Sequence, residues 1–270
     1  MKIAFIGGGN MAGALIGGLL RQGVPATDLS AVDLSPQTCE HLTKTFGINA
    51  GTQLSERLRD QEAIVLAVKP QHLKEAAQSL APYLRGQLVI SIAAGVHAAV
   101  LSRWLGGYDQ IVRCMPNTPA LVGKGISGLA ALSGVDTSRR QLAERVLKAA
   151  GQVIWCDNEA QLDGVTALSG SGPAYVFYFI EAMQQAAAEL GFSEAQGRQL
   201  AIATVAGAAE LAAQSSEPAS VLRERVTSKG GTTFAALTSF EHDGVKAAIV
   251  RGIHAAHARS RELGAELGAD

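Results

Sequence analysis

The pattern of apolar residues along the chain changes near residue 160. Before that point, short runs that are nearly all apolar alternate with stretches in which apolar residues recur every three or four positions. The runs are typical of strands buried on both faces, and the stretches are typical of amphipathic helices. The predicted strands are residues 3–6, 29–32, 63–68, 88–92, 111–115 and 153–156, with a weaker candidate at 125–132. The predicted helices between them are residues 11–22, 36–46, 71–84, 98–105 and 138–150. This alternation predicts an α/β fold with a parallel, doubly wound sheet.

After residue 160 the strand pattern stops, and turn residues separate long helical stretches. These stretches are residues 174–190, 194–213, 232–242 and 245–267. We therefore predict two domains: a dinucleotide-binding domain over residues 1–161 and an all-α C-terminal domain for substrate binding and dimerisation over residues 162–270. The helices are rich in Ala, and their small-residue faces suit close packing either between two subunits or within one chain.

Composition excludes several classes of protein. The net charge is −1, and no run of Lys or Arg stands out among the 270 residues, so we expect neither nucleic-acid nor membrane binding. No apolar stretch reaches the roughly 18 residues of a membrane span. The three cysteines and six histidines are scattered, which predicts no disulfide framework and no metal site. The chain enters its first strand without a signal-peptide pattern, so we expect a cytoplasmic protein.

A glycine-rich turn follows the first predicted strand. Gly7, Gly9 and Ala12 fit the pattern G-x-G-x-x-A. In that pattern the first glycine permits a tight turn, the second lets the backbone approach a pyrophosphate, and the small third residue lets helix and strand pack closely. Backbone N–H groups at Asn10 and Met11 would face the phosphates. The motif predicts a Rossmann-like dinucleotide site, and the alternative is a turn with a purely structural role.

Two polar residues follow the second predicted strand. A carboxylate at Asp33 would accept hydrogen bonds from an adenosine ribose and repel a 2′-phosphate, which favours NAD. Ser35 could instead donate to a 2′-phosphate. The alternative role for Asp33 is to cap the helix that starts at Pro36.

Three more turns lie at the carboxyl ends of predicted strands, where ligands of such sheets bind. Their small residues would let a nicotinamide ribose lie against the backbone, and Lys69 could reach a phosphate or ribose. Asn117 is placed to bind the carboxamide or the substrate. A solvated lysine and a rigid proline-rich connector are the alternatives. The predicted cofactor-binding residues in these turns are Ala67, Val68, Lys69, Pro70, Ala93, Ala94, Gly95 and Asn117.

The helical half lacks the usual acid for ketone reduction. Such enzymes normally use Lys or His to protonate the product, and residues 174–190 contain neither. Two segments, residues 169–175 and 226–233, instead combine hydroxyls with N–H groups at a predicted helix start, which suits a substrate carboxylate. Hydroxyls without a strong acid suit a C=N substrate, because its protonated nitrogen activates its own carbon. Each segment is otherwise an ordinary helix cap.

Six segments, taken in their order along the chain, together resemble those of the pyrroline-5-carboxylate reductases. They are residues 7–12, 67–70, 91–95, 113–119, 169–175 and 226–233. The resemblance implies hydride transfer from NADPH, with NADH also accepted, to the imine carbon of Δ1-pyrroline-5-carboxylate. The product would be L-proline, in the last step of proline biosynthesis.

The resemblance also implies roles for particular residues. The backbone amides of the loop within residues 226–233 would hold the substrate carboxylate. Thr233 would be the catalytic residue, hydrogen-bonded to the ring nitrogen of the substrate. The predicted substrate-binding residues are Ser228, Gly230, Gly231, Thr232, Asn117 and Ser171. The helical domain would form an interlocked homodimer, and five dimers would form a decamer. Lys229 stands where many relatives have Pro, and Asp33 where several have a small or neutral residue.

Two other functions remain open from the sequence. A β-hydroxyacid dehydrogenase would share the two-domain layout but would need a lysine within residues 174–190. A nucleotide-binding regulatory protein without turnover would need no second polar pocket.

Overall fold

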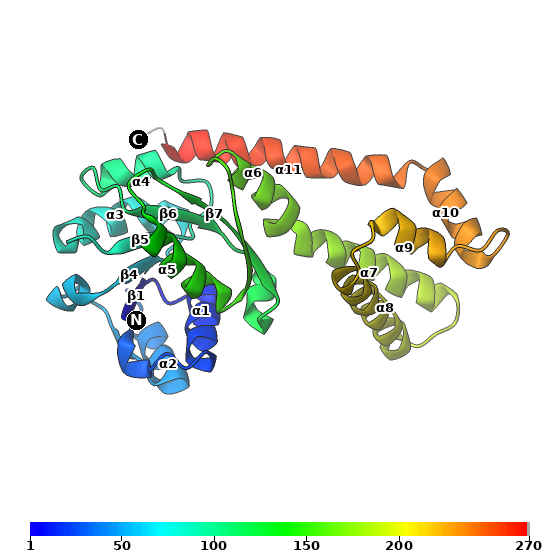
Figure 1. Cartoon of the computed structure of the whole chain (residues 1–270). Coiled ribbons are helices and arrows are strands. Elements are labelled where there is room, and N and C mark those ends of the chain that lie inside the picture. The colour runs from blue at the N-terminus through cyan, green and yellow to red at the C-terminus, as the bar shows by residue number, and fades with distance from the viewer. Residues whose placement is uncertain (269–270) are drawn as a thin grey trace. The chain divides into compact units, whose positions relative to one another are not determined.

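The computed structural model describes residues 1–268 and divides into two compact units. The first unit comprises Met1–Ser171 together with the chain from Ala256, and the second comprises Gly172–Ala255 (Figure 1). Residues 269 and 270, the end of the predicted second domain, lie outside the described residues. Within residues 1–268, no helix has both the length and the apolar character that a bilayer span requires.

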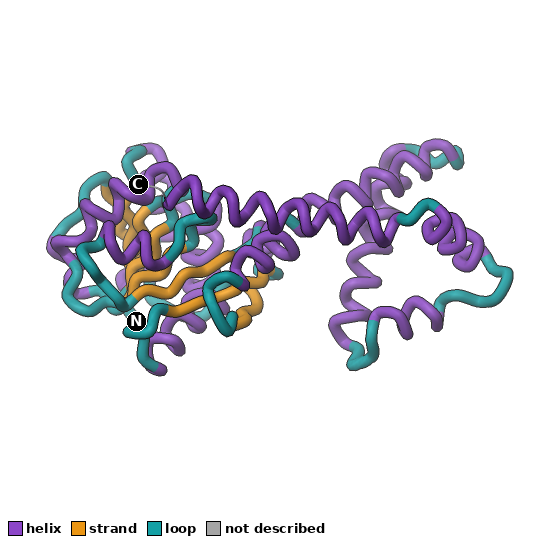
Figure 2. The backbone as a smooth tube through the Cα atoms, turned by 90° about the horizontal axis from the view of Figure 1, so that it is seen from above, coloured by secondary structure: helices purple, strands orange, loops and turns teal. Residues whose placement is uncertain are grey.

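An eight-stranded sheet forms the centre of the first unit, in the order β3-β2-β1-β4-β5-β6-β7-β8. All strands (orange in Figure 2) lie in this unit. Neighbouring strands pair in parallel except β6 and β7, which pair antiparallel. The strands are β1 (Ile3–Ile6), β2 (Leu29–Val32), β3 (Asn49–Gly51), β4 (Ala63–Leu66), β5 (Leu88–Ser91), β6 (Ile111–Met115), β7 (Gly125–Ala131) and β8 (Gly151–Trp155).

Helices cover both faces of this sheet. They are α1 (Asn10–Arg21), α2 (Pro36–Phe46), α3 (Pro70–Leu80), α4 (Ala98–Trp104), α5 (Thr137–Lys148) and α6 (Gln161–Val165), the last continued by a π-helical turn, η5 (Thr166–Gly170). Along β1, Ile3 and Phe5 join a core with residues of α1 and α5, while Ala4 and Ile6 join a second core with residues of α3 and α4. Alternate residues of one strand therefore enter opposite cores, which is why the strand is apolar at every position.

The prediction of a parallel sheet fails at one pair of strands. Residues 116–124, between β6 and β7, contain only the short 3-10 helix η4 (Thr118–Val122). A parallel connection needs a crossover of about a dozen residues or more. The chain therefore turns back, and β7 runs antiparallel to β6. Helix α5 then supplies a crossover that makes β8 parallel to β7.

The second unit is entirely helical, as predicted. Its elements are α7 (Gly172–Glu189), α8 (Glu194–Gln214), α9 (Ala219–Arg225), α10 (Thr232–His242) and the first part of α11 (Val245–Gly268). Helices α7 and α8 pack against each other. Many large apolar side chains of this unit are nevertheless exposed, among them Phe177, Tyr178, Phe179, Leu200, Phe234 and Ile249. Such a surface is typical of an interaction site.

The end of α11 belongs to the first unit and packs near the turn that follows β5. The hydroxyl of Ser260 donates to Asp163 Oδ1 at 2.7 Å, and both residues are buried. Gly264 permits close packing, because a Cβ there would lie 2.9 Å from His97 Nε2. A Cβ on Gly95 would lie 2.9 Å from Leu267 Cδ1. The last turns of α11 therefore support one of the predicted cofactor turns.

Candidate functional site

The glycine turn between β1 and α1 requires glycine at its first two positions. Gly7 has φ +97°, and a Cβ there would lie 2.6 Å from the carbonyl oxygen of Ala67. A Cβ on Gly8 would lie 2.6 Å from Thr38 Cγ2 and 2.7 Å from Leu42 Cδ1. A Cβ on Gly9 would meet nothing within 4 Å. The first two glycines are thus demanded by the fold, whereas the third faces open space that a ligand can enter.

The start of α1 has the features of an anion site. Its N-cap is Gly9, which supplies no side-chain hydrogen bond to the first turn. The backbone N–H groups of Asn10, Met11 and Ala12 therefore have no side-chain cap, and the positive end of the helix dipole lies among them. Ala12 is fully buried between helix and sheet. These residues fit a pyrophosphate in the way that the sequence predicts.

Asp33 holds this turn in place. Its Oδ2 accepts from the backbone N–H of Gly8 at 2.7 Å, and its Oδ1 accepts from that of Ser35 at 2.9 Å. The N-cap of α2 is Ser35, whose hydroxyl accepts from Thr38 N. The alternative in which Asp33 caps α2 is therefore wrong.

A cavity of about 410 Å³ lies beside Asp33 at the carboxyl ends of β1, β2 and β4. Its lining includes Gly7, Gly9, Asp33, Ala67, Val68 and Lys69, and Pro70 is the first residue of α3. The structure thus brings the predicted residues of three separate turns to one cavity. Leu34, which is 85% exposed, and Leu54 add an apolar edge suited to a nucleobase, and His72 lines the same cavity. Sequence reasoning missed these three residues because they belong to no motif, although Leu34 directly follows Asp33.

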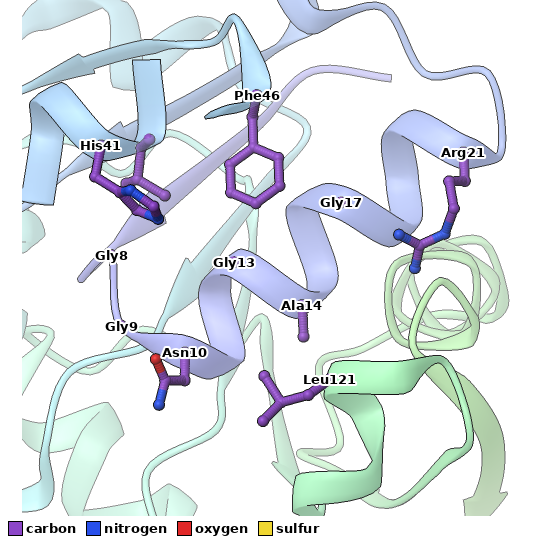
Figure 3. Close-up of a pocket in the computed structure, with 11 residues that line it drawn as sticks. Gly8, Gly9, Asn10, Gly13, Ala14, Gly17, Arg21, His41, Phe46 and Leu121 are labelled. Atoms are coloured by element: carbon purple, nitrogen blue, oxygen red, sulfur yellow. The ribbon is translucent and has the colours of Figure 1, made fainter. Parts of the chain in front are cut away.

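A second cavity, of about 300 Å³, lies along the outer side of α1 and shares Gly9 with the first (Figure 3). Asn10 and His41 line it near the glycine turn, and Arg21 lines it at the other end of the helix. A Cβ on Gly17 would lie 3.2 Å from the Phe46 ring. The small residues of α1 therefore let the end of α2 pack closely against α1.

The turn after β5 contains Ala93, Ala94 and Gly95, and the latter has φ +79°. An ion pair between the buried Arg113 and the partly buried Glu159 supports the chain just beyond it. Arg113 Nη1 lies 2.9 Å from Glu159 Oε1, which also accepts from the backbone N–H of Ala98 at 2.7 Å. Burying charges is costly unless such hydrogen bonds compensate. The pair thus fixes the start of α4 directly behind the turn.

Asn117 lies at the end of the β6 strand and is only 9% exposed. Its Oδ1 accepts from the backbone N–H of Ile126 at 3.0 Å, and its Nδ2 donates to the hydroxyl of Ser169 at 3.0 Å. The structure therefore joins Asn117 to the segment that contains Ser171. That connection was not predicted from the sequence.

The hydroxyl-rich loop of the second unit leads into α10. Gly230 has φ +74°, and Gly231 N donates to the carbonyl oxygen of Ser228 at 3.0 Å. Gly231 is the N-cap of α10 and supplies no side-chain hydrogen bond. The N–H groups at the start of α10, including those of Thr232 and Thr233, therefore have no side-chain cap and form a second site suited to an anion. Asn117 and Ser171 belong to the first unit, whereas this loop belongs to the second.

Comparison with known proteins identifies the family. The chain is 46% identical to a pyrroline-5-carboxylate reductase of Pseudomonas aeruginosa over 99% of this chain and 98% of that protein. It belongs to the pyrroline-5-carboxylate reductase family. The Haemophilus influenzae reductase is 40% identical, with 97% of each chain covered. The sequence model described as pyrroline-5-carboxylate reductase dimerisation matches residues 159–263, and one described as NADP oxidoreductase, coenzyme F420-dependent, matches residues 2–95.

Solved structures agree with this family. The Coxiella burnetii pyrroline-5-carboxylate reductase superposes with a TM-score of 0.93 at 37% identity, covering 97% of this chain and 98% of that one. The Plasmodium falciparum pyrroline carboxylate reductase, solved with NADP bound, has a TM-score of 0.86 at 30% identity, covering 98% of each chain. A 3-hydroxyisobutyrate dehydrogenase of Mycobacterium tuberculosis, at 17% identity and a TM-score of 0.51, shares the fold alone. The predicted family and fold class are confirmed. Within residues 1–268, no group of three or more His, Cys, Asp or Glu side chains is arranged to hold a metal ion.

Proposed function

We propose that this protein reduces Δ1-pyrroline-5-carboxylate to L-proline with NADPH, and with NADH as an alternative donor, as the last step of proline biosynthesis. The observation that carries the proposal is the similarity to curated reductases over nearly the whole chain, 46% in the example above. This similarity includes both the glycine turn, which we propose for the cofactor, and the hydroxyl-rich loop, which we propose for the substrate.

The reduced nicotinamide supplies a hydride when the cofactor is bound. The chain's own residues bind and orient that cofactor. The open face of Gly9 and the uncapped N–H groups of α1 hold the pyrophosphate. The cavity beside Asp33 and Leu34 would hold the adenosine, and the Ser35 hydroxyl, which accepts from Thr38 N, would also donate to a 2′-phosphate. Ala67, Val68 and Lys69 line the same cavity, and the Ala93–Gly95 turn would line the nicotinamide end.

The loop before α10 recognises the substrate. Backbone amides of Ser228 and Gly230, with Thr232 at the start of the helix, bind the carboxylate, while Gly231, whose N–H donates to Ser228 O, closes the loop that presents them. The hydroxyl of Thr233 hydrogen-bonds the ring nitrogen and keeps a proton there as hydride reaches the neighbouring carbon. Helix α7 contains no Lys or His, and the substrate needs none, because a protonated imine activates its own carbon.

The functional protein is a homodimer formed by residues 162–270, and residues 1–161 bind the cofactor. The match of the dimerisation model to residues 159–263 and the exposed Phe177, Tyr178 and Phe179 of α7 support this division. We also propose that five dimers assemble into a decamer. The free cysteines are those of a reducing compartment, which supports a cytoplasmic location.

The experiment mixes the purified protein with pyrroline-5-carboxylate and either NADPH or NADH, and follows the absorbance of the reduced nicotinamide. We expect stoichiometric oxidation and formation of L-proline. A parallel reaction with 3-hydroxyisobutyrate and NAD or NADP tests the hydroxyacid dehydrogenase alternative. Oxidation of that alcohol without reduction of the imine would overturn the proposal, and so would no turnover with either cofactor.

A further inference from the structure

The side-chain amide of Asn117 forms hydrogen bonds to other groups of the protein. Its amide oxygen accepts from strand β7 at Ile126 N, and its amide nitrogen donates to Ser169 Oγ, both at 3.0 Å. Because the residue is 9% exposed, little of the amide remains to face a ligand. This geometry differs from that of a residue that binds cofactor or substrate directly.

Ser169 lies in the π-helical turn η5, which ends the first unit. The turn is closed by a hydrogen bond from Ser171 N to Thr166 O at 2.8 Å. A Cβ on Gly170 would lie 2.5 Å from Met115 Cε, so the turn also packs closely against the end of β6. Two adjacent residues of η5 thus contact the end of β6 and its loop, one by a hydrogen bond and one by close packing.

A π-helical turn contains one residue more than an α-helical turn, and such turns occur often at functional sites. In an α-helix each residue advances by about 100° around the axis. Relaxation of η5 to α-helical hydrogen bonding would therefore turn the Ser171 side chain by about that angle. A bond that holds Ser169 opposes this relaxation.

We propose that Asn117 is a positioning residue that acts through Ser169: it holds η5 in its π-helical form and so fixes the orientation of Ser171. The inference rests on the proposed function, since Ser171 is a predicted substrate residue. In this role, the loop at residues 115–119 supports the segment that contains Ser171 and does not bind the nicotinamide directly.

The test compares Ser169→Ala, Asn117→Ala and the double variant with the wild type. Ser133→Ala, in the exposed turn after β7, is the matched control. The measurements are kcat/KM for pyrroline-5-carboxylate, the Kd of NADPH, and amide hydrogen exchange across residues 162–173. We expect each single variant to lower kcat/KM about 10-fold, the scale of one lost hydrogen bond, and to speed exchange in η5. The Kd of NADPH should stay within about twofold of the wild-type value.

The double variant should be no worse than the poorer single variant, because both changes remove the same bond. Asn117→Ala also leaves Ile126 N without its partner and can unfold the protein. In that event Ser169→Ala, with Ser169→Thr as the variant that keeps the hydroxyl and restores activity, decides the question alone.

Three results would overturn the positioning role. They are unchanged exchange in Ser169→Ala, losses in kcat/KM that multiply in the double variant, and a tenfold loss of NADPH affinity in Asn117→Ala that Ser169→Ala does not share. A wild-type protein that fails to reduce the imine would instead overturn the proposed function. In that case, amide exchange in η5 still tests whether the hydrogen bond between Asn117 and Ser169 holds this turn.

Discussion

Replacement of Asp33 by Ser separates two effects of one carboxylate, its support of the glycine turn and its repulsion of a 2′-phosphate. The carboxylate accepts from Gly8 N at 2.7 Å and from Ser35 N at 2.9 Å. Hydrogen bonds to a charged group contribute about 1.5–3 kcal/mol each. Because the site is half-exposed and a serine hydroxyl can replace one acceptor, we expect a loss of about 2 kcal/mol. That loss lowers Tm by roughly 4–8 °C.

The second effect is electrostatic and depends on the cofactor. A 2′-phosphate carries nearly two negative charges at neutral pH. If the phosphate lies about 7 Å from the carboxylate in a water-like dielectric, the repulsion between them amounts to about 1.2 kcal/mol. Removal of the carboxylate should therefore raise the ratio of kcat/KM for NADPH to that for NADH about eightfold at low salt. The rise should shrink as salt approaches physiological strength, where the screening length is about 8 Å.

The assay measures kcat/KM with each cofactor at two salt concentrations, beside a thermal melt. Asp33→Asn, which keeps the size of the side chain but removes its charge, is the control for shape. A lower Tm with an unchanged cofactor ratio would show that Asp33 supports the glycine turn without facing the ribose. An unchanged Tm would refute the hydrogen-bonding role derived from the structure.

Four further predictions follow from the site and the core. Thr233→Ala should lower kcat/KM by roughly 10- to 1000-fold, and Thr233→Ser should recover most of it; an unchanged value would mean that solvent protonates the nitrogen. Gly9→Ala should weaken NADPH binding more than tenfold with a Tm change below about 3 °C, because a Cβ there meets nothing in the free protein; equal cofactor affinity would contradict the pyrophosphate site. Glu159→Ala leaves the buried Arg113 unpaired and should cost about 3 kcal/mol in urea denaturation, whereas a loss below about 1 kcal/mol would refute that role. Burial raises the pKa of Cys114 to about 12, so the thiol stays protonated at pH 8 and should resist iodoacetamide until unfolding; labelling of the native protein, detected by mass spectrometry, would contradict it.

Strands whose two faces are both buried were the most predictable part of the fold. The bounds of β1, β2 and β6 match the predicted runs, because these strands are nearly all apolar, with Ser30 and Arg113 as their polar residues. Strand β3 (Asn49–Gly51) was missed, since it is short, polar at its start and held by backbone pairing to β2. Helix α9 was missed as well, because its seven residues carry too few apolar positions to show a period.

The glycine turn and the ends of the strands were predictable because each is encoded within a few neighbouring residues. The supports behind them were not. Asn117 and Ser169 are 52 residues apart, and Arg113 and Glu159 are 46 apart. Polar residues at such separations carry no local signal of their pairing. The sequence therefore identifies candidate ligand-binding turns, whereas the structure is needed to see what holds those turns in position.

The extent of the apolar surface of the second unit was also not predictable from neighbouring residues. Helical periodicity predicts α7 and α8, but it does not reveal how much of each helix the chain itself can cover. Phe177, Tyr178 and Phe179 are consecutive, so they cannot all face one neighbouring helix, and all three are exposed in the single chain. A partner subunit is the natural cover for side chains of this kind.

The most direct test of the reductase assignment follows the hydride itself. The protein is incubated with pyrroline-5-carboxylate and NADPH that carries deuterium at the transferred position of C4, and the product is analysed by mass spectrometry and chiral chromatography. We predict L-proline that carries one deuterium at C5. Proline without deuterium, or oxidation of NADPH without formation of proline, would contradict transfer of hydride to the imine carbon.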